Sequence, residues 1–382
     1  MYEIGKAELR NIAKVIESGQ TFRYRGGEGG WCDRFEAALA RKIGVRHALA
    51  TSSGTAALTC AMVGLGLGPG DEVIVPAYTF MASAIAVLAA GAIPIIAEVD
   101  GSMMMDPKDA ERKITRHTRA IMPVHMMGRL CDMKSILGIA RKHKLMVIED
   151  ACQAVGGSYR GRRAGSLGKA GCFSFNHFKN IACGEGGAVL TNDAVVIDRA
   201  RIYHDGGAVF RQNAAEVRIP FFAGSNFRIS EFQGAILDAQ LKRLDGILAR
   251  LRARQAAMLE ILAKSGRFTL AASNEVKGDC GSTVWMRFGS KAEAKAFVER
   301  HGGVGRPIET GRHVYANWDP IMNRRGAHHP RLNPYNWARR KIEYSPDMCP
   351  RSLDLMSRTV FASVPYKASI GEARRLAKAL AE

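Results

Sequence analysis

Three short segments combine residues that can bind an anion, balance a positive charge and act as a nucleophile. The first is TSSGTAAL at 51–58, where a short apolar run ends in a turn and an apolar helical pattern begins. A helix N-terminus presents free N–H groups and the positive end of the helix dipole, so this turn can bind a phosphate. The alternative is an ordinary N-cap, in which a Ser or Thr side chain only caps the helix.

The second segment, VIEDACQAVGG at 147–157, runs from an apolar strand directly into Asp150. An acid at a buried strand end is costly unless it is paired, although an N-cap aspartate would also fit the pattern. The third, at 172–192, places Lys179 in a turn after a strand that ends at Ser174. A lysine among apolar neighbours can have a lowered pKa and become a nucleophilic amine that forms a Schiff base. The alternative is an ordinary surface lysine, which stays protonated.

The anion turn, the acid and the lysine occur in an order that suits the chemistry of one cofactor. Pyridoxal 5'-phosphate (PLP) has a phosphate to anchor, a pyridine nitrogen to keep protonated and an aldehyde to hold as an imine. An anion turn, then a strand-end acid, then a lysine in a loop after a strand would meet these needs in turn. A fourth segment, GSNFRISEFQGAILDAQL at 224–241, adds Asn226 and Arg228 before a long helical pattern. The sequence therefore predicts a PLP site.

Short apolar runs alternate with helical patterns between residues 47 and 192. Strands of this kind, separated by helices, indicate right-handed crossovers and a mainly parallel sheet with helices on both faces. The carboxyl ends of parallel strands form the crevice in which open α/β sheets bind ligands, and the segments above lie at such ends. The predicted strands are 47–52, 71–76, 92–99, 119–124, 145–150, 169–175 and 187–192.

The pattern changes near residue 229. A helix predicted at 230–264 would link a large N-terminal domain (1–240) to a smaller α+β domain (241–382). The smaller domain has a strand-like segment at 282–289 and a helix-like one at 291–302. A His-, Trp-, Asn- and Pro-rich loop at 312–337 is too long for a plain connector, and long loops in compact domains are usually functional.

Composition excludes several other classes of protein. The 382 residues are 47% hydrophobic and carry a formal net charge of +19, but no nucleic-acid-binding motif accompanies the dispersed basic residues. We therefore expect an anionic substrate and no nucleic-acid partner. No apolar run approaches the ~18–20 residues of a membrane span, so no membrane insertion is expected. The N-terminal residues form an amphipathic helical pattern, not a signal peptide, which favours a cytoplasmic protein.

Two patterns have structural explanations. The eight cysteines include no Cys-x-x-Cys pair, and most lie in apolar surroundings, so buried free thiols are expected and no metal site or disulfide. The segment GLGLGPG at 64–70 superficially resembles a dinucleotide-binding fingerprint. It ends a helical pattern and precedes a strand, which is the reverse of the required order, so a helix end and turn are predicted.

The chain as a whole resembles the DegT/StrS-type sugar aminotransferases. The resemblance rests on SSGTAAL, GPGDEVIVPAYTFMASA, EDACQAVGGSYRGRRAG, CFSFNHFKNIACGEGGAVLTN and GSNFRISEFQGAILDAQL, which occur in the order of the family. It implies an aspartate-aminotransferase-like fold (fold type I) and PLP as cofactor. Within the family, TFRY at 21–24 and YANW at 315–318 are most similar to the transaminases that make 8-amino-8-deoxy-Kdo, a lipopolysaccharide sugar.

The resemblance also assigns roles to residues. Lys179 would form the imine and move the proton, and Asp150 would pair with the pyridine nitrogen. Gln153 would lie near the ring hydroxyl, and Phe80 would stack on the ring. The phosphate would be held by Ser53, Gly54, Thr55 and Ser174.

Further implications concern assembly and reaction type. Asn226 would reach the phosphate of the neighbouring subunit's cofactor, so a homodimer with active sites at the subunit interface is expected. Family dehydratases carry histidine in place of the lysine, so Lys179 favours transamination. Many members have His directly after Ser-Phe in the lysine loop, whereas here Asn176 precedes His177, which leaves the role of His177 open.

The predicted reaction moves an amino group from L-glutamate or L-glutamine to the aldehyde or ketone of an oxidised sugar such as 8-oxo-Kdo. A nucleotide-linked keto-sugar or an inosose is an alternative acceptor, and dehydration or aromatisation is an alternative reaction. A guanidinium can bind a carboxylate or phosphate bidentately. The candidate substrate contacts are Arg23, His125, Arg228, Arg312 and Tyr315. The alternatives are that His125 only caps its loop and that each arginine has a surface or structural role.

Overall fold

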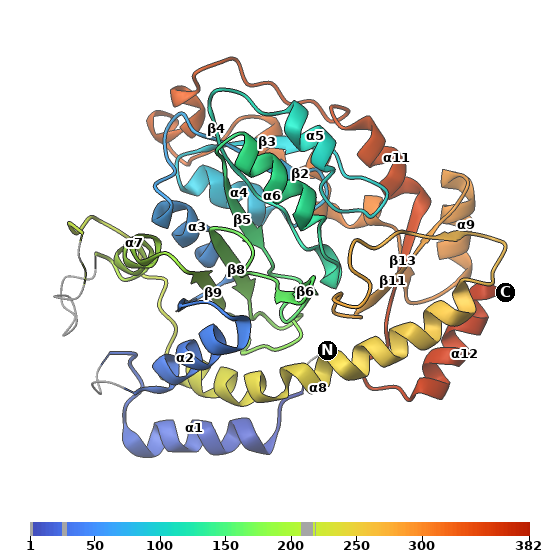
Figure 1. Cartoon of the computed structure of the whole chain (residues 1–382), viewed down its shortest axis with the longest axis horizontal. Coiled ribbons are helices and arrows are strands. Elements are labelled where there is room, and N and C mark those ends of the chain that lie inside the picture. The colour runs from blue at the N-terminus through green and yellow to red at the C-terminus, as the bar shows by residue number, and fades with distance from the viewer. Residues whose placement is uncertain (1–2, 25–28, 208–216, 218) are drawn as a thin grey trace.

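A seven-stranded sheet in the order β1-β9-β8-β5-β4-β2-β3 forms the centre of the protein in a computed structural model (Figure 1). The structure describes residues 3–24, 29–207, 217 and 219–382. All seven strands lie within the ranges predicted from the sequence or one residue outside them. Their bounds are β1 (His47–Thr51), β2 (Glu72–Pro76), β3 (Ile93–Ala97), β4 (Thr118–Ile121), β5 (Met146–Asp150), β8 (Ala170–Ser174) and β9 (Gly187–Thr191).

The sheet is mainly parallel, as predicted. β2 pairs in parallel with β3 and β4, and β5 pairs in parallel with β4 and β8. Only the pairings of β9, with β1 and with β8, are antiparallel. The carboxyl ends of β5 and β8 therefore lie at the same edge of the sheet. Asp150 is the last residue of β5, and Ser174 is the last residue of β8.

Helices cover both faces of the sheet and create two hydrophobic cores. Consecutive residues of β2 enter opposite cores, with Val73 and Val75 on one face and Ile74 on the other, because side chains alternate along a strand. One core is closed by α3 (Gly54–Gly64), α4 (Ala82–Ala89) and α7 (Ala194–His204), and the other mainly by α2 (Trp31–Ile43), α5 (Pro107–Arg112), α6 (Met133–Lys142) and α8 (Glu231–Leu262).

The segment at 64–70 is the predicted helix end and turn. α3 ends at Gly64, and the following residues lead into β2. Gly66 and Gly70 have φ of +74° and +85°, a left-handed conformation that glycine adopts at no steric cost. This excludes the strand-to-helix order of a dinucleotide-binding fingerprint.

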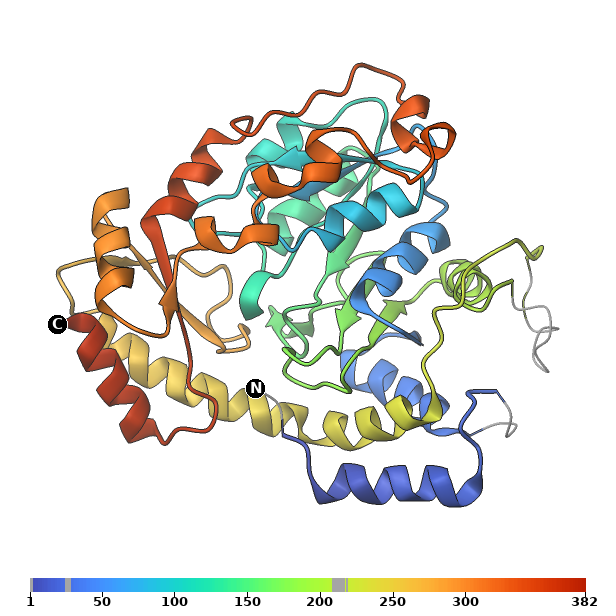
Figure 2. The same cartoon turned by 180° about the vertical axis from the view of Figure 1, so that it is seen from behind.

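Helix α8 is 32 residues long and runs past both sheets of the molecule (Figure 1). It packs against α1 (Lys6–Ser18), α2 and, near its C-terminal end, α12 (Ile370–Ala381), as Figure 2 shows from behind. This confirms the long helix predicted at 230–264. The domain boundary at 240/241 lies within α8 and stays a prediction.

A smaller antiparallel sheet follows, in the order β10-β11-β13-β12. Its strands are β10 (Thr269–Leu270), β11 (Thr283–Arg287), β12 (Val304–Gly305) and β13 (Thr359–Ser363), and its helices are α9 (Lys291–Arg300) and α11 (Pro350–Arg358). The predicted strand at 282–289 and helix at 291–302 are thus confirmed. A small hairpin, β6 (Ser158–Tyr159) and β7 (Arg162–Arg163), was not predicted.

The segment 312–337 is not an irregular loop. It contains α10 (Asp319–Met322) and several short 3₁₀ turns, with Trp318 fully buried and Trp337 exposed. Prolines at 320, 330 and 334 begin three of these short helices, where a missing N–H costs nothing. Periodicity arguments cannot detect elements of three or four residues.

All eight cysteines are free thiols, as predicted, and six are buried. Cys152 and Cys183 are half-buried. In the described part of the chain, no helix is both long and apolar enough to cross a membrane.

The packing of β9 against the turn after β1 generates a stability prediction. A Cβ atom at Gly187 would lie 2.3 Å from the carbonyl oxygen of Ser53. Gly187→Ala must therefore push the two backbones apart, and we expect the free energy of unfolding to fall by about 1–3 kcal/mol in urea titrations.

The matched control is Gly138→Ala in α6, where a Cβ would meet nothing within 4 Å. Removing a glycine from a helix interior should raise the free energy of unfolding by about 0.5–1 kcal/mol. Equal effects of the two substitutions would contradict the close approach at Gly187.

Candidate active site

The turn after β1 has the geometry of an anion site. Ser53 caps α3, and its Oγ accepts a hydrogen bond from the Ala56 N–H at 3.0 Å. The N–H groups of Gly54 and Thr55 have no carbonyl partner within the helix, because the first turn of any helix leaves its N–H groups unpaired. The N-cap and the anion site are therefore compatible: Ser53 caps the helix, and the N–H groups beside it are available to a phosphate.

Gly54 joins three of the predicted segments. A Cβ atom at this position would lie 2.8 Å from Ser174 Cβ and 3.0 Å from Cys152 Sγ. The anion turn, the residues after Asp150 and the end of β8 thus meet at one point. Gly54 thus lets Ser174 and Cys152 approach the N-terminus of α3 more closely than any side chain would allow. The free N–H groups of that turn, the Asp150 carboxylate and the Lys179 amine are the groups that a phosphate, a pyridine nitrogen and an aldehyde require, so the residues present fit PLP.

Asp150 lies at the end of β5 and is 5% exposed. Its Oδ1 accepts a hydrogen bond from the Cys152 N–H at 3.1 Å, and its Oδ2 accepts one from the Ser83 hydroxyl at 2.7 Å. A buried carboxylate is tolerated when donors compensate its charge. The sequence indicates that a buried Asp150 needs a partner, and Ser83 of α4 is such a partner.

Lys179 is half-buried in the loop between β8 and β9. The loop is anchored by the Asn180 side chain, whose Nδ2 donates to the Val155 carbonyl at 3.0 Å. Burial lowers the pKa of Lys179 from its usual 10.5, and the nearby Cys152, Asp150 and Glu185 partly oppose this effect. Lys179 is thus within electrostatic reach of Asp150 and is not a freely solvated surface lysine.

A C-terminal segment lies across the turn that carries Phe80. The Thr79 and Met81 N–H groups donate to the carbonyls of His313 and Arg312, both at 3.0 Å. The centroid of the Phe80 ring lies 5.3 Å from that of the His313 ring, and the Arg312 guanidinium lies 5.5 Å from the centroid of the Phe80 ring. Arg312 is exposed, and in the described part of the chain no carboxylate pairs with it, so it remains available to an anionic substrate.

His313 is a residue that the sequence argument missed. Burial lowers the pKa of its imidazole; the Thr310 carbonyl opposes this shift, and Lys179 and Arg312 add to it. Nδ1 lies 3.1 Å from that carbonyl. The signal that could have identified it is its position next to Arg312, at the start of the unusual segment 312–337.

Three further predicted residues lie on loops around these groups. The Gln153 side chain accepts a hydrogen bond from the Met127 N–H at 3.2 Å. Asn226 is exposed. The carbonyl of the next residue, Phe227, accepts a 2.7 Å hydrogen bond from the Ser52 N–H, which places the segment 226–228 beside the anion turn. Arg228 forms an ion pair with Asp205 at 2.5 Å. The structure leaves their roles as predictions.

Three of the candidate substrate contacts are buried, and their polar groups are paired within the chain. Arg23 is 4% exposed, and its guanidinium pairs with Glu36 and donates to the Ala50 carbonyl at 2.9 Å, beneath β1. Tyr315 is fully buried: its hydroxyl donates to the Pro346 carbonyl and accepts from the Cys349 N–H. Arg23 thus has the structural contacts that the alternative interpretation expects, and Tyr315 holds the residues that precede α11.

His125 is the third such residue, and its contacts agree with the alternative in which it only supports its loop. It is fully buried, and Nδ1 accepts a hydrogen bond from the Cys131 N–H at 3.1 Å. Nε2 therefore carries the proton and donates it to Glu149 at 3.1 Å. Glu149 also accepts hydrogen bonds from three backbone N–H groups at 165–168, so this pair organises a loop and does not face the crevice.

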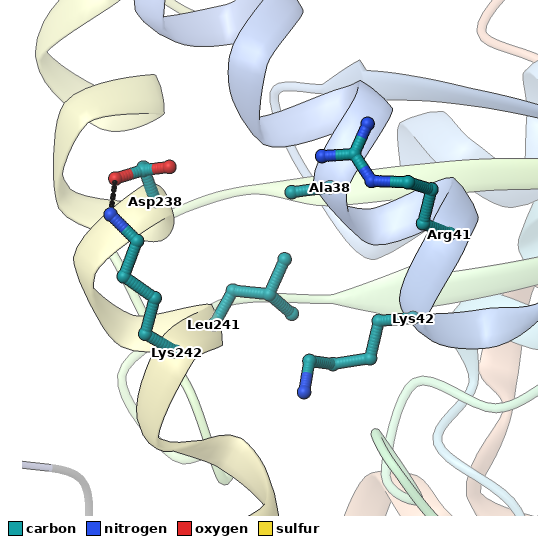
Figure 3. Close-up of a pocket in the computed structure, with 6 residues that line it drawn as sticks. All are labelled: Ala38, Arg41, Lys42, Asp238, Leu241 and Lys242. Atoms are coloured by element: carbon teal, nitrogen blue, oxygen red, sulfur yellow. Dashed lines mark hydrogen bonds and ion pairs between the residues drawn. The ribbon is translucent and has the colours of Figure 1, made fainter.

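A surface pocket of about 400 Å³ between α2 and α8 is separate from these residues (Figure 3). It is lined by aliphatic groups and by charged side chains that include the Asp238–Lys242 ion pair at 2.7 Å. None of the candidate site residues lines it, so this pocket is not part of the candidate active site.

Known proteins share this sequence and fold. A GDP-perosamine synthase of Caulobacter vibrioides is 45% identical over 216 residues, which are 56% of this chain and only 57% of that protein. A dTDP-3-amino-3,4,6-trideoxy-alpha-D-glucose transaminase of Streptomyces venezuelae is 41% identical over 69% of this chain and 67% of that protein. The solved structure of 3-amino-5-hydroxybenzoic acid synthase is similar with a TM-score of 0.83, at 28% identity, over 99% of this chain and 96% of that one.

The model of one protein family matches residues 2–306, which include the anion turn, Asp150, Lys179 and Asn226. The resemblance noted from the motifs is therefore confirmed at the level of the family, and the fold is that of fold type I. By this match over most of its length, the chain belongs to the DegT/DnrJ/EryC1/StrS aminotransferase family.

Proposed function

We propose that this protein is a PLP-dependent transaminase that moves an amino group from L-glutamate or L-glutamine to the carbonyl of an oxidised sugar. The observation that carries the proposal is the close approach of Ser174 and Cys152 to the anion turn at Gly54, together with the electrostatic influence of Cys152 and Asp150 on Lys179. When bound, PLP supplies an aldehyde that reacts with amines and a ring that withdraws electrons.

The residues of the chain would divide the work. Burial makes the Lys179 amine easier to deprotonate, as a nucleophile and proton carrier requires. The Asp150 carboxylate would hold the proton of the pyridine nitrogen. Ser53, Gly54, Thr55 and Ser174 would bind the phosphate, Phe80 would cover the ring, and Gln153 would lie near the ring hydroxyl.

The acceptor is proposed to carry a negative charge. The net charge of +19 favours anionic ligands, and the exposed guanidinium of Arg312 lies over Phe80, which is proposed to cover the cofactor ring. The named relatives include makers of nucleotide-linked amino sugars, and others are described as inosose aminotransferases. A carboxylate-bearing sugar such as 8-oxo-Kdo is the narrower proposal.

We also propose a homodimer in which Asn226 completes the site of the partner. Asn226 is exposed at the mouth of its own anion turn, as a residue that contacts a second copy would be. Arg228 would then be a positioning residue, because its pairing with Asp205 holds this strand.

Replacing Lys179 tests the central claim. Lys179→Ala should lower turnover by at least about 10²–10⁴-fold, the contribution of a positioned acid–base group, and should abolish the visible absorbance of covalently held PLP. The exposed Lys134→Ala serves as the control and should keep both. Full activity in Lys179→Ala would refute the assignment. If neither glutamate nor glutamine bleaches the wild-type absorbance, the reaction is not the proposed transamination.

The same lysine should limit the stability of the cofactor-free protein. Its pKa is lower in the folded than in the unfolded chain, so unfolding takes up a proton between the two values and stability rises with pH in that window. Lys179→Met, which keeps the aliphatic stem, should therefore raise the melting temperature below the lowered pKa. The difference should shrink as pH rises toward 10.5.

A screen of oxo-sugars, added singly to the enzyme after it has reacted with glutamate, identifies the acceptor through recovery of the cofactor absorbance. With an acceptor that carries a carboxylate or phosphate, Arg312→Ala should raise KM about tenfold, the scale of one hydrogen bond to a charged group. Arg312→Lys should restore part of the loss. Arg325→Ala, which removes an exposed arginine paired with Asp319, should have no effect.

Subunit complementation tests the shared site. Lys179→Ala and Asn226→Ala chains, each weakly active alone, should regain activity when mixed and allowed to exchange. Each mixed dimer would hold one site with both residues intact. If mixing restores nothing although the chains form mixed dimers, Asn226 does not serve the partner.

A further inference from the structure

Two hydroxyl groups lie in series behind Asp150. The Ser83 Oγ is 2.7 Å from Asp150 Oδ2, and the Thr79 Oγ1 is 2.7 Å from Ser83 Oγ. Ser83 is fully buried and Thr79 is 1% exposed. Neither residue has a role in the function proposed above.

The direction of these hydrogen bonds follows from the chemistry of the groups. An ionised carboxylate can only accept, so the Ser83 hydroxyl must donate its single proton to Asp150. The Ser83 oxygen is then free to accept, and the Thr79 hydroxyl donates to it. The competing acceptor is the Phe80 carbonyl, which lies 3.3 Å from both hydroxyls and is therefore the weaker partner.

Local structure explains why the two hydroxyls meet. Thr79 follows β2, and Ser83 lies in the first turn of α4, four residues later. The Ser83 N–H donates to the Phe80 carbonyl at 3.1 Å, and this turn brings the two hydroxyls together. Phe80 stands between them in sequence. A single turn would thus both cover the cofactor ring and support the carboxylate that pairs with its nitrogen.

We propose that Thr79 and Ser83 are positioning residues that hold the Asp150 carboxylate oriented toward the pyridine nitrogen of PLP. This inference rests on the proposed function. Hydrogen bonds to a carboxylate stabilise its charge, and a carboxylate held in one orientation loses less entropy when it binds a cation. Without the Ser83 hydroxyl, Asp150 would lose its 2.7 Å hydrogen bond and keep the longer one, from the Cys152 N–H at 3.1 Å.

The test measures the dissociation constant of PLP from the purified cofactor-free protein, together with the absorbance spectrum of the bound cofactor. Ser83→Ala should weaken PLP binding about tenfold to a hundredfold, the scale of a lost hydrogen bond to a charged group. Thr79→Val, which removes the hydroxyl at constant shape, should weaken it less. Thr79→Ser should bind like the wild type, because it keeps the donor.

A double-mutant cycle separates positioning from general packing. If Ser83 acts through Asp150, adding Ser83→Ala to Asp150→Asn should change the dissociation constant by less than about twofold. The matched control is Ser352→Ala, at a fully buried serine whose hydroxyl donates to Glu98 at another place in the fold. It should lower the melting temperature without changing PLP binding or the spectrum.

The outcomes are distinguishable. If the wild type holds PLP and Ser83→Ala binds it equally tightly with an unchanged spectrum, the inference is wrong while the proposed function stands. An equal loss in the wild-type and Asp150→Asn backgrounds would likewise overturn it, because the effect would then be one of packing. If the wild type itself neither binds PLP nor reacts with glutamate, both the function and the inference fall.

Discussion

The absence of a side chain at Gly54 is the constraint on which the candidate site depends. Because Ser174 and Cys152 approach this position so closely, the turn after β1, the end of β5 and the end of β8 share one small volume. The N–H groups of the turn, the Asp150 carboxylate and the Lys179 amine would then serve one molecule of cofactor, as proposed above. The two hydrophobic cores make this arrangement rigid, since every strand involved is buried on both faces.

Within that volume, the two key charges have opposite surroundings. Asp150 accepts hydrogen bonds from a backbone N–H and a hydroxyl, both of which favour a negative charge. Burial lowers the pKa of Lys179, because it disfavours a positive charge. Different environments for neighbouring titratable groups are a common way to keep one ionised while the other reacts. The folded protein therefore bears an electrostatic cost in the place where chemistry would occur.

The sequence predicts much of this architecture because its strongest signals are local. Seven buried strands have apolar runs bounded by turn residues, and Asp150 and Lys179 lie next to such runs, so their placement needs no knowledge of distant contacts. The open questions concern residues whose partners the sequence cannot identify. For His125 the sequence allows a substrate contact or a loop support, and only the structure shows that Glu149 and Cys131 occupy both ring nitrogens. Arg23 and Tyr315 are polar groups enclosed in the same way, and Thr79, Ser83 and His313 become relevant only when the strand ends and the C-terminal segment meet.

The attachment of residues 312–315 has a consequence for how such proteins diversify. Three backbone hydrogen bonds, to Ala77, Thr79 and Met81, join this segment to the turn before α4, and it lies beyond the 2–306 region that matches the family model. Main-chain pairing is indifferent to side-chain identity. Mutations can therefore change the side chains at 312 and 313 without removing these hydrogen bonds. The proposed substrate contact at 312 could then vary among related proteins while the residues proposed to bind the cofactor stay the same.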